Sequence, residues 1–176
     1  MIKYSAFLRG INVGGHRLIK MDYLRQLFTE VGLQKVETYI QSGNVFFESE
    51  EKDEQTLVAV IEKHLHNSLG YEVPTFLRTP AQMASVLENY PFATIDDHPN
   101  VKIYVAFLAT PPPSELAKTL MALSTEWEFM HVHNREVYIL LKPFDGKSIF
   151  SNNLLEKKLK MLATTRNWAT VNKMSS

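Results

Sequence analysis

A glycine-rich stretch at residues 9–16 carries residue types that suit the binding of an anion. It reads Arg9-Gly10-Ile11-Asn12-Val13-Gly14-Gly15-His16, and Arg17 follows. Glycines such as Gly14 and Gly15 lack Cβ, so they allow sharp bends and the close approach of another molecule. Backbone N–H groups between a strand and a helix N-terminus attract anions, and basic neighbours strengthen that attraction. We therefore expect an anion to bind at this turn.

The spacing of the glycines excludes two familiar phosphate-binding loops. A P-loop ends in Gly-Lys-Ser/Thr, which does not follow here, and the dinucleotide fingerprint Gly-x-Gly-x-x-Gly has a different spacing. A second interpretation is structural: the glycines permit a tight turn, while Arg9 and Asn12 tie loops to backbone carbonyls. Both interpretations stay open at the level of sequence.

Two further polar stretches offer groups for the same ligand. Residues 41–44 read Gln41-Ser42-Gly43-Asn44 and suit a base edge, a sugar or an amide. Residues 164–167 read Thr164-Thr165-Arg166-Asn167, with a guanidinium that can hold phosphate or carboxylate through two hydrogen bonds. The candidate ligand-binding residues are Arg9, Asn12, Gly14, Gly15, Gln41, Ser42, Asn44, Thr165, Arg166 and Asn167. A network that docks two subdomains is the alternative explanation of this set.

Neither a metal site nor a catalytic centre is evident. His131 and His133 stand two apart on an expected strand and so share a face. Possible third ligands are Glu126, Glu128 and Glu136, but an ordinary strand is the simpler interpretation. Ser42, Ser114 and Thr165 would need a partner base to act as nucleophiles, and His16 is the only histidine expected at the loop end of the first unit. We therefore expect no metal and no cofactor, and we assign no catalytic residue.

The elements that position these residues follow one order twice. The first half predicts a strand at 3–8, a helix at 21–31, a hairpin of 36–40 and 45–47, a helix from the cap Asp53 to 69, and a strand at 73–77. The second half predicts a strand at 101–108, a helix from 114, a hairpin of 127–132 and 137–141, a helix at 152–162 and a strand at 168–171. Residues 79–82 predict a capped extra helix between the halves.

This order predicts the α+β class, as a tandem duplication of a β-α-β-β-α-β ferredoxin-like unit with antiparallel sheets. The expected division is 1–79 for the first subdomain, 80–100 for the linking helix and loop, and 101–176 for the second subdomain. In each unit the topology brings the first strand–helix turn, the hairpin tip and the last helix–strand loop to one end. We therefore expect residues 9–16, 41–44 and 69–73 to meet, and likewise 110–114, 133–135 and 164–167.

Composition limits the class of protein. The chain has 176 residues, 45% hydrophobic, with no cysteine and a formal net charge of zero. The absence of cysteine excludes disulfides and cysteine nucleophiles, and it fits a reducing cytosol. No segment resembles a signal peptide or a membrane span. We therefore expect a cytoplasmic protein without a membrane partner. Zero net charge leaves any nucleic-acid binding to local patches. The acidic run 48–54 is expected to be a solvated loop and helix start.

RNA binding on the sheet surface is a further possibility to weigh. Ferredoxin-like sheets that bind RNA stack bases on exposed aromatics of the central strands. Here the first strands of both halves are apolar at nearly every position, which predicts that both of their faces are buried. We expect the second face to be covered by the partner unit or by the extra helix.

Three stretches resemble motifs of the bacterial family catalogued as domain of unknown function 1697. They are residues 8–15, with Arg9 and Gly10, residues 38–45, with Ser42 and Gly43, and residues 163–168, with Arg166. The resemblance spans nearly the whole chain. It implies two ferredoxin-like subdomains in a cytoplasmic bacterial protein and implies no activity.

The function expected from the sequence is binding of a small anionic ligand, a nucleotide or a nucleic-acid end, at loops facing a cleft between the subdomains. One alternative is an enzyme that uses the same cleft for group transfer or hydrolysis, with Arg9 and Arg166 stabilising negative charge. The other is a protein-interaction module without a small ligand. The sequence predicts no oligomeric state.

Overall fold

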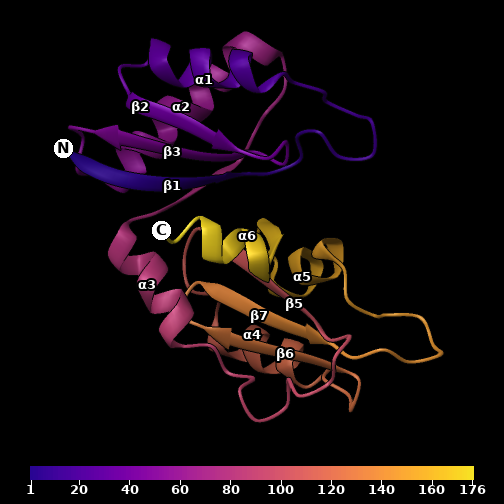
Figure 1. The fold of residues 1–176 in the computed structure, drawn as a ribbon. Coiled ribbons are helices and arrows are strands. Elements are labelled where there is room, and N and C mark those ends of the chain that lie inside the picture. The colour runs from indigo at the N-terminus through magenta and orange to yellow at the C-terminus, as the bar shows by residue number, and fades with distance from the viewer. The chain divides into compact units, whose positions relative to one another are not determined.

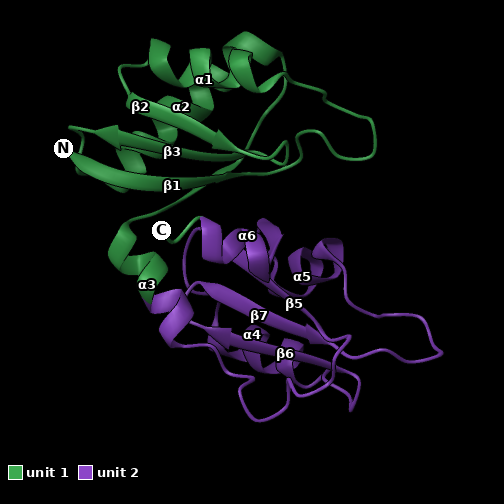
Figure 2. Cartoon of the chain, viewed as in Figure 1, with its two compact units in different colours: residues 1–84, 174–176 green, residues 85–173 purple.

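The structure, a computed structural model, describes residues 1–176 and divides into two compact units. Unit 1 comprises Met1–Ala84 with Met174–Ser176, and unit 2 comprises Ser85–Lys173 (Figure 2). Each unit has one four-stranded antiparallel sheet, and the chain has six helices in all (Figure 1). The predicted α+β class is confirmed, and the element order is consistent with a duplicated β-α-β-β-α-β unit. No helix combines the length and the apolar character needed to cross a membrane.

Unit 1 follows the predicted order closely. Its elements are β1 (Ile2–Leu8), α1 (Met21–Glu30), β2 (Gln34–Tyr39), β3 (Asn44–Ser49), α2 (Glu54–Leu69) and β4 (Thr75–Arg78), and its strand order is β2-β3-β1-β4. Helix α2 begins where Asp53 accepts a hydrogen bond from the Thr56 N–H. It ends at Gly70, which has φ 82° and donates its N–H to the His66 carbonyl. Both predicted ends of this helix are confirmed.

Unit 2 repeats this arrangement. Its elements are β5 (Lys102–Leu108), α4 (Ser114–Met121), β6 (Glu128–His133), β7 (Glu136–Leu141), α5 (Asn152–Leu159), β8 (Ala163–Asn167) and α6 (Trp168–Lys173), and its strand order is β6-β7-β5-β8. The extra helix α3 (Pro80–Glu88) precedes them. The predicted capping box is present, because Thr79 N–H donates to Gln82 Oε1 and Gln82 N–H to Thr79 Oγ1.

The end of the chain differs from the prediction. Helix α5 stops at Leu159 because Lys160 adopts the left-handed conformation, with φ 55° and ψ 40°. The last strand therefore begins at Ala163, and the strand expected at 168–171 is helix α6. Asn167 starts that helix, since its Oδ1 accepts from the Thr170 N–H at 2.8 Å. Residues 164–167, expected in a loop, thus lie in strand β8.

Both faces of the central strands are buried, as their apolar sequences predict. In β1, Tyr4, Ala6 and Leu8 pack into the helix-covered core, whereas Ser5 and Phe7 on the other face are also buried. The C-terminal segment of unit 1 contacts this second face, where the Ser5 hydroxyl donates to the Met174 carbonyl at 2.7 Å. An exposed aromatic platform for RNA bases is therefore not formed on these strands.

In unit 2 the second face of the sheet is covered in part by the extra helix. The buried Tyr138 hydroxyl on β7 donates to the Val86 carbonyl of α3 at 2.6 Å. Helix α6 also packs on β5. The expectation that the extra helix covers a sheet face is therefore met within this unit.

Replacing Gly43 with alanine tests the close packing of the hairpin tip. Gly43 has φ +81°, and an added Cβ would lie 2.9 Å from both Leu8 Cβ and Ile11 Cδ1. We expect Gly43→Ala to lower the free energy of unfolding by about 2 kcal/mol, measured by urea denaturation, because overpacking adds to backbone strain.

Gly32→Ala is the matched control. Gly32 has φ +89° with no atom within 4 Å of the added Cβ, so this variant carries backbone strain alone. It should lose only about half as much stability. Equal losses in the two variants would show that the hairpin tip is not closely packed.

Candidate functional site

Three loops of unit 1 meet at the end where β1 stops; we call them the loop cluster, formed by residues 9–20, 40–43 and 70–74. Leu8 N–H donates to the Gly43 carbonyl at 2.8 Å, which joins the first strand to the hairpin tip. Arg9 N–H donates to the Pro74 carbonyl at 2.9 Å, which joins it to the segment before β4. The convergence expected from the topology of the first unit is present.

Asn12 holds the loop of residues 9–20 in place. Its Nδ2 donates to the carbonyls of Gln41 at 2.7 Å and Ile19 at 3.2 Å, and its Oδ1 accepts from the Ile19 N–H at 2.8 Å. An amide NH₂ has two hydrogens, so both are already used within the protein. Asn12 therefore positions the loop, and its Nδ2 has no hydrogen left to donate to a ligand.

Asn44 and Ser42 also serve the local structure. The Asn44 side chain is fully buried, and its Nδ2 donates to the Tyr39 carbonyl at 3.1 Å and to Ser42 Oγ at 2.8 Å. The part of Gln41 that meets Asn12 is its backbone carbonyl, and its side chain is exposed. The tight-turn interpretation of residues 41–44 thus accounts for Ser42 and Asn44.

The tip of the loop is an exposed reverse turn. Val13 and His16 form an isolated antiparallel bridge, and the two residues between them, Gly14 and Gly15, have φ 57° and 77°. Positive φ at both central positions is the requirement of a type I′ turn. In Figure 1 this loop, between β1 and α1, extends away from the sheet of unit 1. The glycines are therefore needed for the turn itself.

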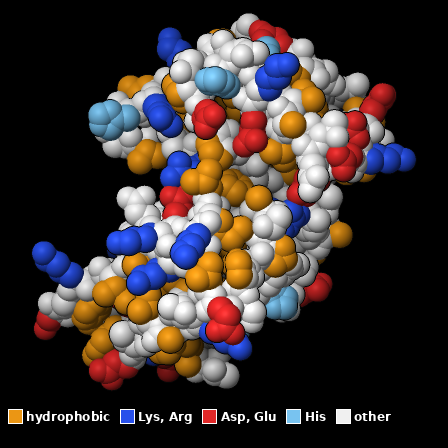
Figure 3. Space-filling view, turned by 180° about the vertical axis from the view of Figure 1, so that it is seen from behind, with side chains coloured by type: hydrophobic (Ala, Val, Ile, Leu, Met, Phe, Trp, Pro, Cys, Tyr) orange, Lys and Arg blue, Asp and Glu red, His pale blue; other side chains and the backbone are white.

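The side chains of this loop are basic and apolar. Residues 9–20 include Arg9, His16, Arg17 and Lys20 and no aspartate or glutamate. Val13 is 62% exposed and Leu18 is 74% exposed. Basic side chains and a histidine are exposed where the loop protrudes from unit 1 (Figure 3). The Arg17 guanidinium lies 4.6 Å from the centre of the Tyr71 ring, a cation–π contact between two of the three loops.

The three candidates from the second half lie on strand β8 of unit 2. Thr165 Oγ1 donates to Asn152 Oδ1 at 2.8 Å, and Asn167 caps α6. Arg166 is 8% exposed, and its Nη1 donates to Thr164 Oγ1 at 2.7 Å and to the Thr165 carbonyl at 3.1 Å. Thr165 and Arg166 are neighbours on a strand, so their side chains lie on opposite faces of the sheet. Burial lowers the pKa of Arg166 to about 10, which still leaves it charged at neutral pH.

A second buried arginine was missed from the sequence. Arg78 in β4 is 0% exposed and pairs in register with Ser5 of β1, as Arg166 pairs with Val105 of β5. Each guanidinium donates to the carbonyl of the preceding residue, Leu77 in one unit and Thr165 in the other. The strands predicted at 73–77 and 168–171 contain neither arginine, so the correspondence appears only when the observed strands β4 and β8 are aligned. A buried arginine therefore occupies the same position of the last strand in both units.

Hydroxyl groups among the candidates are not arranged as activated nucleophiles. The Thr165 hydroxyl donates to an amide oxygen, which is not a base, and Ser42 Oγ accepts from the Asn44 amide. His131 and His133 are exposed on β6, and no group of three or more potential metal ligands occurs in the structure.

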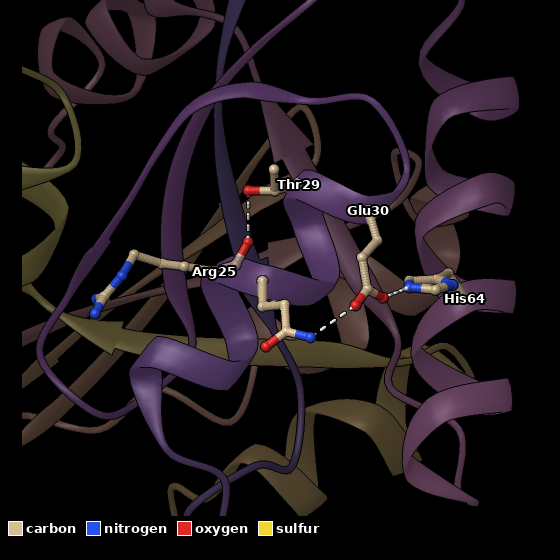
Figure 4. Close-up of polar contacts among 5 residues, drawn as sticks. Arg25, Thr29, Glu30 and His64 are labelled. Atoms are coloured by element: carbon tan, nitrogen blue, oxygen red, sulfur yellow. Dashed lines mark hydrogen bonds and ion pairs between the residues drawn. The ribbon is translucent and has the colours of Figure 1, made fainter.

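One histidine–carboxylate pair does form, between helices α1 and α2 (Figure 4). His64 Nε2 lies 2.7 Å from Glu30 Oε2, and Gln26 Nε2 donates to Glu30 Oε1 at 2.9 Å. These hydrogen bonds, Gln26 first and then His64, lower the pKa of the Glu30 carboxyl. The nearby Thr29 hydroxyl donates to the Arg25 carbonyl and not to the pair. The pair therefore links two helices.

Comparison with known proteins assigns the chain. The family described as "Protein of unknown function (DUF1697)" matches residues 1–138. The chain belongs to this family. It is also similar to the conserved bacterial protein SP0830 from Streptococcus pneumoniae, with 26% identity and a TM-score of 0.73 over 99% of this chain and 97% of that one. No curated protein matches the chain. The resemblance to DUF1697 found in the sequence motifs is thus confirmed.

Replacing Asn12 tests whether it holds the loop. Asn12→Ala removes one acceptor and two donors and leaves the Ile19 N–H without its partner, so we expect a loss of about 1–2 kcal/mol in unfolding free energy. Hydrogen exchange at the Ile19 amide, followed by NMR, should become faster.

Gln41→Ala is the control, because it removes an exposed side chain and keeps the carbonyl that Asn12 contacts. It should leave both the stability and the Ile19 exchange rate unchanged. If the Gln41 variant lost as much stability as the Asn12 variant, the hydrogen bonds of the Asn12 side chain would not be what holds the loop.

Proposed function

We propose that the DUF1697 protein is a binding protein whose loop cluster in unit 1 takes an anionic ligand of the nucleotide or nucleic-acid-end class. The observation that carries the proposal is an exposed loop, held by Asn12, that presents basic side chains without any acidic one. Such a local excess of positive charge attracts phosphates even though the whole chain is neutral. The strand order β2-β3-β1-β4 also supports the ferredoxin-like assignment of the unit.

Arg17 is the residue best placed to contact a phosphate. Its guanidinium lies over the Tyr71 ring, with Cζ 4.6 Å from the ring centre, and carries five N–H donors. This cation–π contact holds the guanidinium beside the loop cluster, where its N–H groups can donate to a pair of phosphate oxygens. Lys20 and His16 are exposed on the same loop and add charge around it.

The backbone of the turn is open to a ligand. A Cβ added at Gly15 would have no atom within 4 Å, so the space beside this residue is empty. Successive backbone N–H groups in left-handed or turn conformations form concavities that bind anions. We therefore assign Gly14 and Gly15 to backbone contacts with the ligand, and Arg9 adds positive charge at the start of the same loop.

The remaining candidates take other roles in this proposal. Asn12, Ser42 and Asn44 hold the loops, and Gln41 contributes a side chain at the rim. Arg166, Thr165 and Asn167 belong to the internal hydrogen bonding of unit 2, so the proposed site rests on unit 1 alone. An enzyme that performs group transfer or hydrolysis has no supporting arrangement among these residues.

A second candidate function is protein interaction through the same loop. Val13 and Leu18 are large apolar side chains with exposed fractions of 62% and 74%. Neighbouring apolar side chains exposed to solvent are a feature of contact surfaces. In this function the turn inserts into a partner protein and the basic residues surround the contact.

Isothermal titration with a nucleoside diphosphate and a 5′-phosphorylated oligonucleotide tests the first function. We expect at least one of them to bind, and Arg17→Ala to weaken it by about tenfold, since a charge-assisted hydrogen bond is lost. Lys157→Ala removes the same charge from an exposed position in unit 2 and should change the affinity little.

Absence of binding by both probes to folded protein would contradict the anion proposal. So would equal effects of the Arg17 and Lys157 variants, because the attraction would then be non-specific. The protein-interaction function predicts instead that Val13→Ser and Leu18→Ser abolish capture of a defined partner while the Arg17 variant keeps it.

A further inference from the structure

A pocket lies at the end of unit 1 opposite the loop cluster. Ser49 pairs with Ile2 at the start of β1, whereas the loop cluster follows Leu8 at the end of that strand. The pocket has a volume of about 310 Å³, within the range of small-molecule sites. The lining residues that matter for binding are Leu33, Glu50, Glu51, Leu57 and Val60.

One wall of the pocket is apolar. Leu33 and Leu57 belong to the core of unit 1, with 5% and 3% exposure, and line the pocket from within. Val60 on α2 is 44% exposed at the pocket. A ligand with a hydrocarbon part would remove this surface from water, which favours binding in proportion to the area covered.

The rim of the pocket is acidic. Glu50 and Glu51 line the pocket. They belong to the run 48–54, which has five carboxylates against Lys52 alone, so its formal charge is 1 − 5 = −4. Carboxylates are exposed at this end of unit 1 in Figure 3. Helix α1 also ends here, at Glu30, and the C-terminal end of a helix carries partial negative charge.

The carboxylates of this run differ in what they contact. Glu51 Oε1 accepts from the Asp53 N–H at 2.8 Å, and Asp53 Oδ2 accepts from the Thr56 N–H at 2.9 Å, so these two shape the start of α2. Glu48 pairs with Lys35 at 3.2 Å. Glu50 lines the pocket, is exposed and has no hydrogen bond or ion pair in the structure. Its carboxylate is therefore available to a ligand.

We propose that this pocket binds a small organic cation, an ammonium group on an apolar stem. The ammonium contacts the Glu50 carboxylate at the rim, and the stem packs against Leu33, Leu57 and Val60. The charge of the rim disfavours anions, and a single available carboxylate does not provide the ligand set that a metal ion requires. This site is separate from the loop cluster and takes a ligand of the opposite charge.

The test is an NMR titration of the full chain with 2-phenylethylammonium, followed through backbone amide shifts. We expect saturable shifts at pocket residues such as Leu33, Glu50 and Val60, and weaker binding at high salt, where charge attraction is screened. The neutral analogue 2-phenylethanol should bind at least about twofold more weakly, since it lacks the charge.

Two variants locate the contacts. Glu50→Gln should weaken 2-phenylethylammonium by about two- to fivefold, the effect of an exposed ion pair, whereas Glu126→Gln, at an exposed position in unit 2, should not. Val60→Trp fills the pocket from an exposed helix position and should abolish the shifts, with the fold checked by the remaining spectrum. Non-saturable shifts, equal binding of the neutral analogue, or equal effects of the two glutamate variants would overturn the proposal.

Discussion

The side chain of Asn12 makes the hydrogen bonds on which the arrangement of the loop cluster depends. It joins the two ends of the loop of residues 9–20 through Ile19 and fastens that loop to the hairpin tip through the Gln41 carbonyl. In the hairpin tip of residues 40–43, Gly43 lacks a Cβ, which allows the tip to pack closely against Leu8 and Ile11. These contacts order a protruding loop in which Ile11 and Ile19 are buried in the core of unit 1. The basic side chains of the loop are therefore held in a defined place by these hydrogen bonds and by the two buried isoleucines.

Antiparallel topology separates opposite charges within unit 1. The strand β1 leads into the basic loop, and the strand β3 leads away from it to the acidic run 48–54 and the pocket beside it. We therefore propose that the two ends of one sheet attract ligands of opposite sign, while the formal charge of the whole chain is zero. The net charge of the whole chain therefore gives no indication of either proposed site.

The sequence predicted elements wherever local signals set their ends. Asp53 and Gly70 bound α2, and the Thr79 and Gln82 pair starts α3, because these caps act through neighbouring backbone groups. The last strand was misplaced because α5 ends at Lys160 in a left-handed conformation that lysine does not signal. Because α5 ends earlier than predicted, strand β8 also begins earlier, and Asn167 caps helix α6 instead of lying in a loop.

The candidate site was predicted in part, for a similar reason. The predicted topology placed the three loops of unit 1 at one end of the sheet, because the order of the elements determines the direction of each strand. The structure has the three loops there. Residue type alone could not separate Asn12, whose donors are consumed by carbonyls, from Arg17, which stacks on Tyr71 from a distant loop. The buried Arg78 and the pairing of Glu30 with His64 depend on register and on contacts between helices, which single-sequence patterns do not encode.

The most direct measurement is a map of backbone amide shifts during titration of the full chain with a nucleoside diphosphate. The account predicts that the largest shifts occur at Gly14, Gly15 and Arg17 in the loop cluster, and that they saturate. Shifts that are absent there, or that concentrate on residues outside the loop cluster, would contradict it.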